Sequence, residues 1–253
     1  MMRTGFRTLL YKEVLRFFKV AGQTIMAPVL TAVLYLLVFG HALEEHAQVF
    51  PGVSYKAFLI PGLVMMSVLQ NAFANTSSSL IQSKMNGSLV FLLLSPITYW
   101  ETFWAYLLGA IVRGAVVGAG VLVVTFWFAP LSCEAPGWML VFGVLGAGIL
   151  GTLGVIAGIW AEKYDHLATF QNFLITPATF LSGVFYTTAS LPGIWQNVSR
   201  ANPFFYLVDG FRYGFFGQSD VSPILSLAIS GVFFVALAWV AIAMLRRGYK
   251  LRH

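Results

Sequence analysis

The chain has 253 residues, of which 58 % are hydrophobic and only 9 % are charged. Soluble proteins carry about 25 % charged residues, so a soluble fold of this size could not cover its surface with so few. Intrinsic disorder is excluded too, because disordered chains are rich in charge and poor in apolar residues. The formal net charge of +6 comes from basic residues gathered near both ends. That distribution is typical of a membrane protein and does not indicate a nucleic-acid partner.

Residues 1–19 combine basic and apolar side chains at helical spacing. The basic ones are Arg3, Arg7, Lys12, Arg16 and Lys19. The pattern predicts an amphipathic helix lying on the anionic inner surface of the membrane. The alternative is a solvated run of charges that only fixes the orientation of the chain.

Six nearly uncharged stretches follow, and each can hold the roughly 20 apolar residues that cross the hydrocarbon core. We place the spans near 21–40, 58–82, 102–128, 138–161, 167–187 and 222–245. The linkers leave no room for a second domain. The sequence therefore predicts one all-α integral membrane domain over residues 1–253, with six transmembrane helices.

The connections predict the orientation. Cytoplasmic parts would hold Arg3, Arg7, Lys12, Arg16, Lys19, Lys84, Lys163, Arg246, Arg247, Lys250 and Arg252, whereas external parts would hold only Lys56, Arg200 and Arg212. Because cytoplasmic loops carry the excess of Lys and Arg, both termini are predicted to lie in the cytoplasm.

Two of the predicted spans carry sets of polar residues. The second span has Ser67, Asn71, Asn75, Ser78 and Gln82 on one helical face, and the fifth has Gln171, Asn172 and Thr176 at a comparable depth. Polar groups facing lipid would be unsatisfied. We therefore expect either hydrogen bonds between helices or a substrate path that both spans line.

Arg113 is the charged residue inside a predicted span. An intramembrane charge is a candidate functional residue, because its insertion is costly unless it finds a partner. A structural bond to carbonyls or polar neighbours, or snorkelling to the inner headgroups, is the alternative. The sequence does not identify the partner.

Signals for catalysis or metal binding are weak. The chain has no phosphate-binding G-x-x-x-x-G-K-[ST] loop and no Gly-Lys dipeptide. His41 and His46 are five residues apart, about 140° around a helix, unlike the ligand pairs of zinc proteases. We expect no catalytic residues and no metal site in this chain.

Two connections stand out. Residues 84–98 form an apolar segment on the predicted inner side, which indicates either a protein partner or an interfacial helix. Residues 187–220 are rich in aromatic residues and interrupted by Pro192 and Pro203. They predict two short external re-entrant helices before the last span. Asp209 and Arg212 are three residues apart and are expected to form a pair.

These connections resemble those of a known family. Lys84-Met-Asn-Gly-Ser-Leu-Val-Phe-Leu-Leu-Leu-Ser-Pro96 resembles the coupling-helix region of type-2 ABC exporter permeases. Ser182–Tyr186, Leu191-Pro192, Asn202-Pro203 and Asp209–Gly214 are similar to the external signature of that family. The resemblance covers nearly the whole chain and is strongest to drug, polysaccharide and nodulation-factor exporters. The family commonly has acidic residues where this chain has Val90 and Phe91, so a more apolar contact is expected.

The resemblance implies roles for particular residues. ATPase coupling would involve Lys84, Gly87, Leu89, Phe91, Leu92, Pro96 and Asp165, and the external cap would contain Asn202, Pro203, Asp209 and Arg212. The candidate path would be lined by Ser67, Asn71, Asn75, Ser78, Gln171, Asn172 and Thr176.

The resemblance also implies partners and a function. Two copies of a separate ATP-binding subunit would bind ATP and Mg, and a second permease, identical or homologous, would complete the pore. The assembly would export a drug, a lipid or a lipid-linked glycan across the bacterial inner membrane. The alternatives are a secondary carrier, which normally shows inverted repeats, and a membrane-embedded enzyme.

Overall fold

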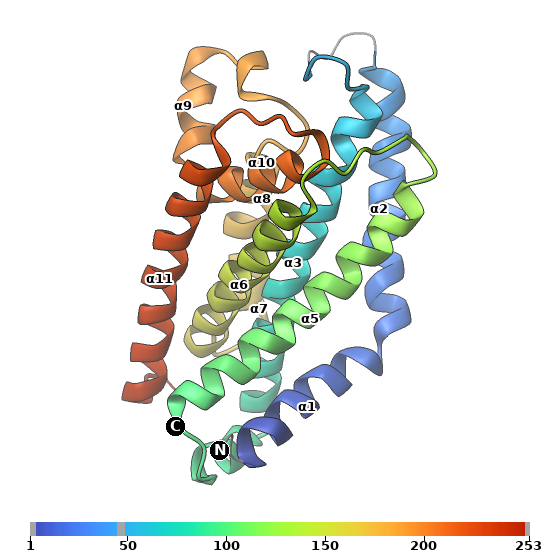
Figure 1. Ribbon diagram of the computed structural model, residues 1–253. Helices are drawn as coiled ribbons and strands as arrows, with labels where there is room; N and C mark the ends of the chain where they lie inside the picture. The colour runs from blue at the N-terminus through green and yellow to red at the C-terminus, as the bar shows by residue number, and fades with distance from the viewer. Residues whose placement is uncertain (1–3, 45–48, 251–253) are drawn as a thin grey trace.

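The structure is a computed structural model that describes residues 4–44 and 49–250, and all regular elements in these ranges are helical. Their bounds are α1 Thr4–Phe18, α2 Ala21–Ala42, α3 Tyr55–Met85, α4 Leu89–Leu94, α5 Tyr99–Thr125, α6 Pro136–Trp160, α7 Tyr164–Phe170, η1 Gln171–Ile175, α8 Thr176–Phe180, η2 Thr188–Ser190, α9 Gly193–Ala201, α10 Pro203–Phe216 and α11 Pro223–Arg247. Helices α2, α3, α5, α6 and α11 are long and apolar enough to cross a membrane (Figure 1). Five of the predicted spans are therefore confirmed as long apolar helices.

The predicted span 167–187 differs from the structure. It is not among the five long helices, because α7, the π-helical segment η1 and α8 follow one another and end at Phe180. A π-turn accommodates an extra residue and interrupts the α-helical ladder. Residues 181–186 have no regular structure, and Gly183 adopts a φ of 78°, a left-handed conformation that favours glycine. The last helix of this region therefore ends at Phe180, seven residues before the predicted end at residue 187.

Helix α3 is the centre of the fold. Its side chains are almost all buried, and it packs against α5, α6 and α10. The contact with α6 is close: a Cβ added to Gly154 would lie 2.5 Å from the Phe73 carbonyl oxygen. Thr76 Oγ1 also donates a 2.7 Å hydrogen bond to the Gly151 carbonyl. These two helices therefore touch backbone to backbone.

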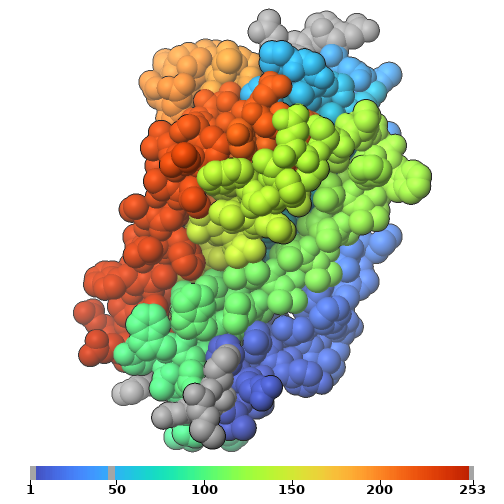
Figure 2. Space-filling model, in the orientation of Figure 1, coloured from blue at the N-terminus to red at the C-terminus, as the bar shows by residue number. Residues whose placement is uncertain are grey.

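The remaining elements occupy the two ends of the bundle. Helix α1, α4 and the last turn of α11 lie at one end, whereas α9 and α10 lie at the other (Figure 1). Figure 2 shows the face on which α6 lies between α11 and α5. The predicted N-terminal helix is present as α1, and the two helices predicted before the last span are present as α9 and α10. Arg3, His46 and Arg252 lie outside the described residues.

Candidate functional site

A buried polar cluster joins α1 to α3. Arg16 is the centre of this cluster: its Nη1 donates to Ser78 Oγ at 3.1 Å, and its Nη2 donates to the Asn75 carbonyl oxygen at 2.6 Å and to Asn75 Oδ1 at 3.3 Å. Glu13 is completely buried one turn earlier, and its Oε1 accepts a 2.7 Å hydrogen bond from Ser79 Oγ. Glu13 Oε2 lies 3.6 Å from Arg16 Nη2. The two charges are thus partnered by each other and by hydroxyl and amide groups of α3.

Glycine in α5 makes room for this cluster. A Cβ added to Gly109 would lie 2.9 Å from Glu13 Cβ and 3.4 Å from Asn75 Nδ2. Any larger residue at this position would push α1 away from α5. Sequence reasoning missed Glu13, although a single acidic residue among the basic residues of 1–19, on the apolar face of that helix, could have indicated a buried role.

Arg113 of α5 has a partner in α3. Its Nη2 donates a 3.1 Å hydrogen bond to Asn71 Oδ1, and Asn71 Nδ2 donates to the Ser67 carbonyl oxygen. The partner that the sequence did not identify is therefore Asn71, on the polar stripe of α3.

The polar stripe of α3 consequently joins helices along most of its length. Asn71, Asn75 and Ser78 bind arginine side chains of α5 and α1. Among the stripe residues, Ser67 instead borders a groove of about 240 Å³ between α2 and α3, together with Thr31, Tyr35 and Gln70. Ser67 is therefore the member of the α3 stripe that lines open space in this groove.

The contact between α3 and α8 is made by residues that the sequence analysis did not select. Gln70 Nε2 lies 3.4 Å from Thr179 Oγ1, to which it donates. Asn172 is exposed on η1, whereas Gln171 and Thr176 are half-buried. Gln70 lies one residue before Asn71 and so belongs to the neighbouring face of α3.

Helix α4 presents an apolar surface at the end of the bundle that carries α1. Phe91 is 77 % exposed and Leu94 is 78 % exposed, whereas Leu89 is buried against the bundle. Leu92 is half-buried and lies in the hydrophobic cluster that contains Leu89. The short helix is thus anchored on one side and leaves its other side uncovered within this chain.

The other predicted coupling residues surround α4 at that end. Lys84 is half-buried and donates from Nζ to the carbonyl oxygens of Ile159 and Ala161, so it caps the end of α6. Gly87 turns the chain into α4 with a φ of 69°, and Pro96 is exposed after it. Asp165 is exposed in the first turn of α7, where the helix dipole stabilises a carboxylate.

The start of α10 is fixed by its cap. Asn202 Oδ1 accepts a 3.0 Å hydrogen bond from the Phe204 backbone N–H, and Pro203 occupies the first turn. The Asn202 Nδ2 donates to the Ala178 carbonyl oxygen at 2.6 Å. This side chain therefore ties α10 to α8.

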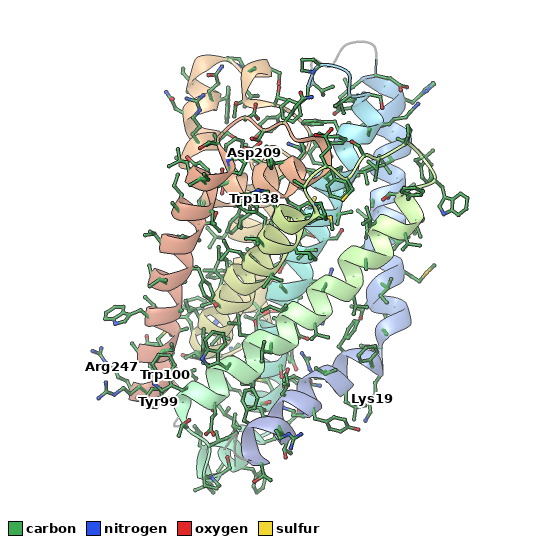
Figure 3. The ribbon with its side chains drawn as sticks, viewed as in Figure 1. Lys19, Tyr99, Trp100, Trp138, Asp209 and Arg247 are labelled. Atoms are coloured by element: carbon green, nitrogen blue, oxygen red, sulfur yellow. The ribbon has the colours of Figure 1, made fainter. Side chains whose placement is uncertain are left out.

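Asp209, labelled in Figure 3, and Arg212 are both buried residues of α10, but the expected pair between them does not form. The ion pairs within 4.0 Å in the described part of the chain do not include them. Asp209 instead accepts from the backbone N–H groups of Asp220 and Val221, at 2.9 and 3.0 Å. The carboxylate thus binds two backbone N–H groups of half-buried residues in the connection between α10 and α11.

Arg212 binds the irregular segment that follows α8. Its Nη2 donates to the carbonyl oxygens of Gly183 and Val184, at 2.9 and 3.4 Å. The guanidinium carbon also lies 3.8 Å from the centroid of the Phe58 ring, a cation–π contact. Non-helical carbonyls inside a membrane protein need such donors, so Arg212 stabilises the unwound end of this segment.

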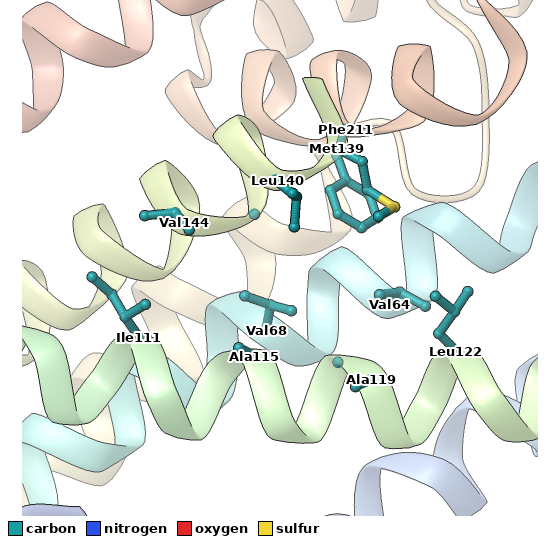
Figure 4. Close-up of a pocket in the computed structure, with 12 residues that line it drawn as sticks. Val64, Val68, Ile111, Ala115, Ala119, Leu122, Met139, Leu140, Val144 and Phe211 are labelled. Atoms are coloured by element: carbon teal, nitrogen blue, oxygen red, sulfur yellow. The ribbon is translucent and has the colours of Figure 1, made fainter. Parts of the chain in front are cut away.

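An apolar pocket of about 190 Å³ lies between α3, α5, α6 and α10 (Figure 4). Val68, Leu122, Val144 and Phe211 are among its lining residues, and all its lining residues are apolar. The described residues also contain no group of three or more His, Cys, Asp or Glu that could hold a metal ion. The arrangement is that of a helical membrane scaffold with polar joints between its helices.

Comparison with known proteins agrees with this arrangement. A family model described as ABC-2 type transporter matches residues 4–216. The protein named inner membrane transport permease YadH from Escherichia coli (strain K12) is 35 % identical over 241 residues, covering 95 % of this chain and 94 % of that protein. Nodulation protein J from Rhizobium leguminosarum bv. viciae is 26 % identical over 237 residues, covering 90 % of this chain and 89 % of that protein.

Proposed function

The chain belongs to the ABC-2 type transporter family, and from that premise we propose what it moves and how it is driven. As a member of this family it is the transmembrane permease subunit of an ABC exporter and has no catalytic activity of its own. Its substrate is a hydrophobic or amphipathic molecule, such as a drug, a lipid or a lipid-linked glycan. Two copies of a separate ATP-binding subunit hold the ATP and Mg and supply the energy, across the bacterial inner membrane.

The uncovered face of α4 carries this proposal. Phe91 and Leu94 are more than three-quarters exposed, on a segment between two long apolar helices at the end where α1 lies. With both termini in the cytoplasm, that end faces the ATP-binding subunits. Exposed apolar surface of this kind is typical of protein–protein contact sites.

A second permease, either a copy or a homologue, covers α2 and the fifth segment, which is the run of α7, η1 and α8 over residues 164–180. Helix α2 exposes Met26, Leu30 and Val38, and η1 exposes Phe173. The groove that contains Ser67 and Gln70 lies beside α2, so a partner on this side would enclose it. We place the substrate path there, with Gln171, Asn172 and Thr176 on its fifth-segment side.

Coupling requires the ATP-binding subunits to bind two states of the permease with different affinity, because otherwise ATP performs no work on it. Helix α1 is a second element through which the ATP-binding subunits can act on α3, since Arg16 and Glu13 connect α1 directly to α3. The α1 surface lies at the inner headgroups in this arrangement.

The test is a pair of matched substitutions of exposed apolar residues at opposite ends of the bundle. Phe91→Asp should abolish co-purification of a P-loop ATPase and its ATP hydrolysis, because a charge would be buried in the contact. Ile194→Asp, which changes a residue of α9 that is 79 % exposed, should leave both unchanged. Normal ATPase binding and export by the Phe91→Asp protein, at wild-type membrane levels, would overturn the docking role of α4.

A further inference from the structure

A groove of about 780 Å³ separates the cytoplasmic-end turns of α5 and α11, within the range of about 300–1,000 Å³ found for small-molecule sites. Its walls include Tyr99, Trp100 and Trp104 from α5, and Trp239, Arg246 and Arg247 from α11. Figure 3 shows Tyr99, Trp100 and Arg247 close to one another at the lower left. Aromatic rings thus line a hollow that two guanidinium groups close at one end.

The hollow follows from the side-chain sizes along α11. Ala238 and Ala243 lie between the larger lining residues, so the wall is recessed beside Trp239. Trp239 is 72 % exposed, and Arg246 lies seven residues further along, about 10 Å nearer the end of the helix. This order, with aromatic rings first and arginines nearer the end, matches the passage from acyl chains to headgroups in a bilayer.

Arg246 and Arg247 have no carboxylate partner among the described residues. The ion pairs formed within the described ranges do not include Arg246 or Arg247, and both are exposed. Lys250 is different, because its Nζ lies 2.6 Å from Glu162 Oε1, and this hydrogen bond raises the pKa of the Lys250 ammonium. A helix C-terminus favours cations, which accounts for the charge at this position but not for the aromatic hollow beside it.

We propose that this groove binds one anionic phospholipid of the cytoplasmic leaflet. The phosphodiester lies between the guanidinium groups of Arg246 and Arg247, since guanidinium matches phosphate oxygens with paired hydrogen bonds. One acyl chain follows the hollow past Trp239 and Trp100. The lipid here is a bound component of the permease, and the assignment does not depend on which substrate the exporter moves; only the choice of leaflet follows from the proposed orientation.

The first test measures lipid selectivity. The purified full chain is placed in detergent with equal amounts of phosphatidylglycerol and phosphatidylcholine of the same acyl composition, and the bound lipid is counted by native mass spectrometry. The wild type should retain phosphatidylglycerol at least tenfold over phosphatidylcholine. Arg246→Gln with Arg247→Gln should lose that preference.

A control variant removes the same charge elsewhere at this end. Arg7 is exposed on α1 and Lys19 is exposed directly after it, and Figure 3 shows Lys19 on the opposite side of the molecule from Tyr99, Trp100 and Arg247. Arg7→Gln with Lys19→Gln should keep the preference for phosphatidylglycerol. An equal loss in both double variants would show bulk attraction only and would overturn the site, as would a wild type without preference.

The second test locates the lipid without relying on charge. Phosphatidylglycerol with a photoreactive group in its acyl chain should label peptides that contain residues 99–104 and 235–243. Trp239→Ala should reduce that labelling severalfold, because it removes the exposed wall of the hollow. Labelling confined to other helices would exclude a lipid as the occupant of the groove. Loss of labelling when a second copy or the ATPase is bound would exclude it too, because that protein would then cover the groove.

Discussion

Buried charge fixes the position of α1. Glu13 has no exposed surface and Arg16 is partly buried, so each depends on the other and on α3 for compensation. Removing one member of a buried pair leaves the other unpaired and costs about 3–5 kcal/mol, whereas replacing both costs far less. Lys12, whose side chain is 50 % exposed, also lies near Glu13, but solvent screens that contact.

This asymmetry predicts the behaviour of three variants. Arg16→Gln should lower the free energy of unfolding in detergent by about 3 kcal/mol, and Glu13→Gln with Arg16→Gln should lower it by clearly less than Arg16→Gln alone. Lys12→Gln should change it by less than about 1 kcal/mol. Denaturant titration of the purified protein measures all three, and a double variant that is less stable than Arg16→Gln alone would contradict the coupling.

Asp209 and Arg212 bind separate partners, so exchanging the two side chains should not restore stability or export. Hydrogen bonds to charged groups contribute about 1.5–3 kcal/mol, so Asp209→Ala should destabilise the protein by at least about that amount. The Asp209→Arg, Arg212→Asp double variant should be no better than either single change, because arginine cannot accept from the N–H groups of Asp220 and Val221. Melting temperature and export both report this, and recovery in the double variant would indicate a direct pair.

At the scale of elements, the fifth segment is joined to α3 by few polar contacts. The Gln70–Thr179 contact lies beyond the π-turn, so it reports whether α8 keeps its rotation relative to α3. A single residue inserted into or removed from a helix turns everything after it by about 100°. The π-turn thus decides which face of α8 meets α3.

A disulfide crosslink tests this arrangement. With Cys133 replaced by serine, Gln70→Cys and Thr179→Cys should form a disulfide on mild oxidation, since the native side chains touch. The matched pair Asn75→Cys with Asn172→Cys should crosslink poorly, because Asn75 is buried against Arg16 and Asn172 is exposed. Mobility on non-reducing gels distinguishes them, and the opposite ranking would place the stripe of α3 on the fifth segment after all.

The limits of sequence reasoning are visible in these elements. Long apolar runs located five helices, because crossing a bilayer imposes a length that composition alone reveals. The polar stripe of α3 was also found, but its partners were not, since a periodic pattern gives the face of a helix and not the helix opposite. Arg16 and Arg113 supply those partners from segments far away in the chain. The end of α8 was misplaced because residues 181–186 carry no charge, yet unwind where Arg212 satisfies their carbonyls.

At the scale of the whole molecule, the orientation is a prediction that the native cysteine can test. Cys133 is exposed in the connection between α5 and α6, at the end opposite α4. In intact cells a membrane-impermeant maleimide should label it. A Ser88→Cys variant lacking Cys133 should react only after the membrane is opened, because Ser88 is exposed directly before α4. The reverse pattern of labelling would place both termini outside.

The 31-residue helix α3 is about 46 Å long, and its backbone contact with Gly154 leaves no soft layer of side chains in which movement could be absorbed. Pro61 removes one hydrogen bond near the start of α3, and from there the helix behaves as a stiff rod about 37 Å long that ends three residues before α4. A tilt of about 5° at one end of such a rod displaces the other by about 3 Å. A small tilt imposed on α3 beside α4 thus becomes a larger displacement at the opposite end of the bundle. The length of the helix alone produces this displacement, and no series of side-chain contacts between the two ends is required.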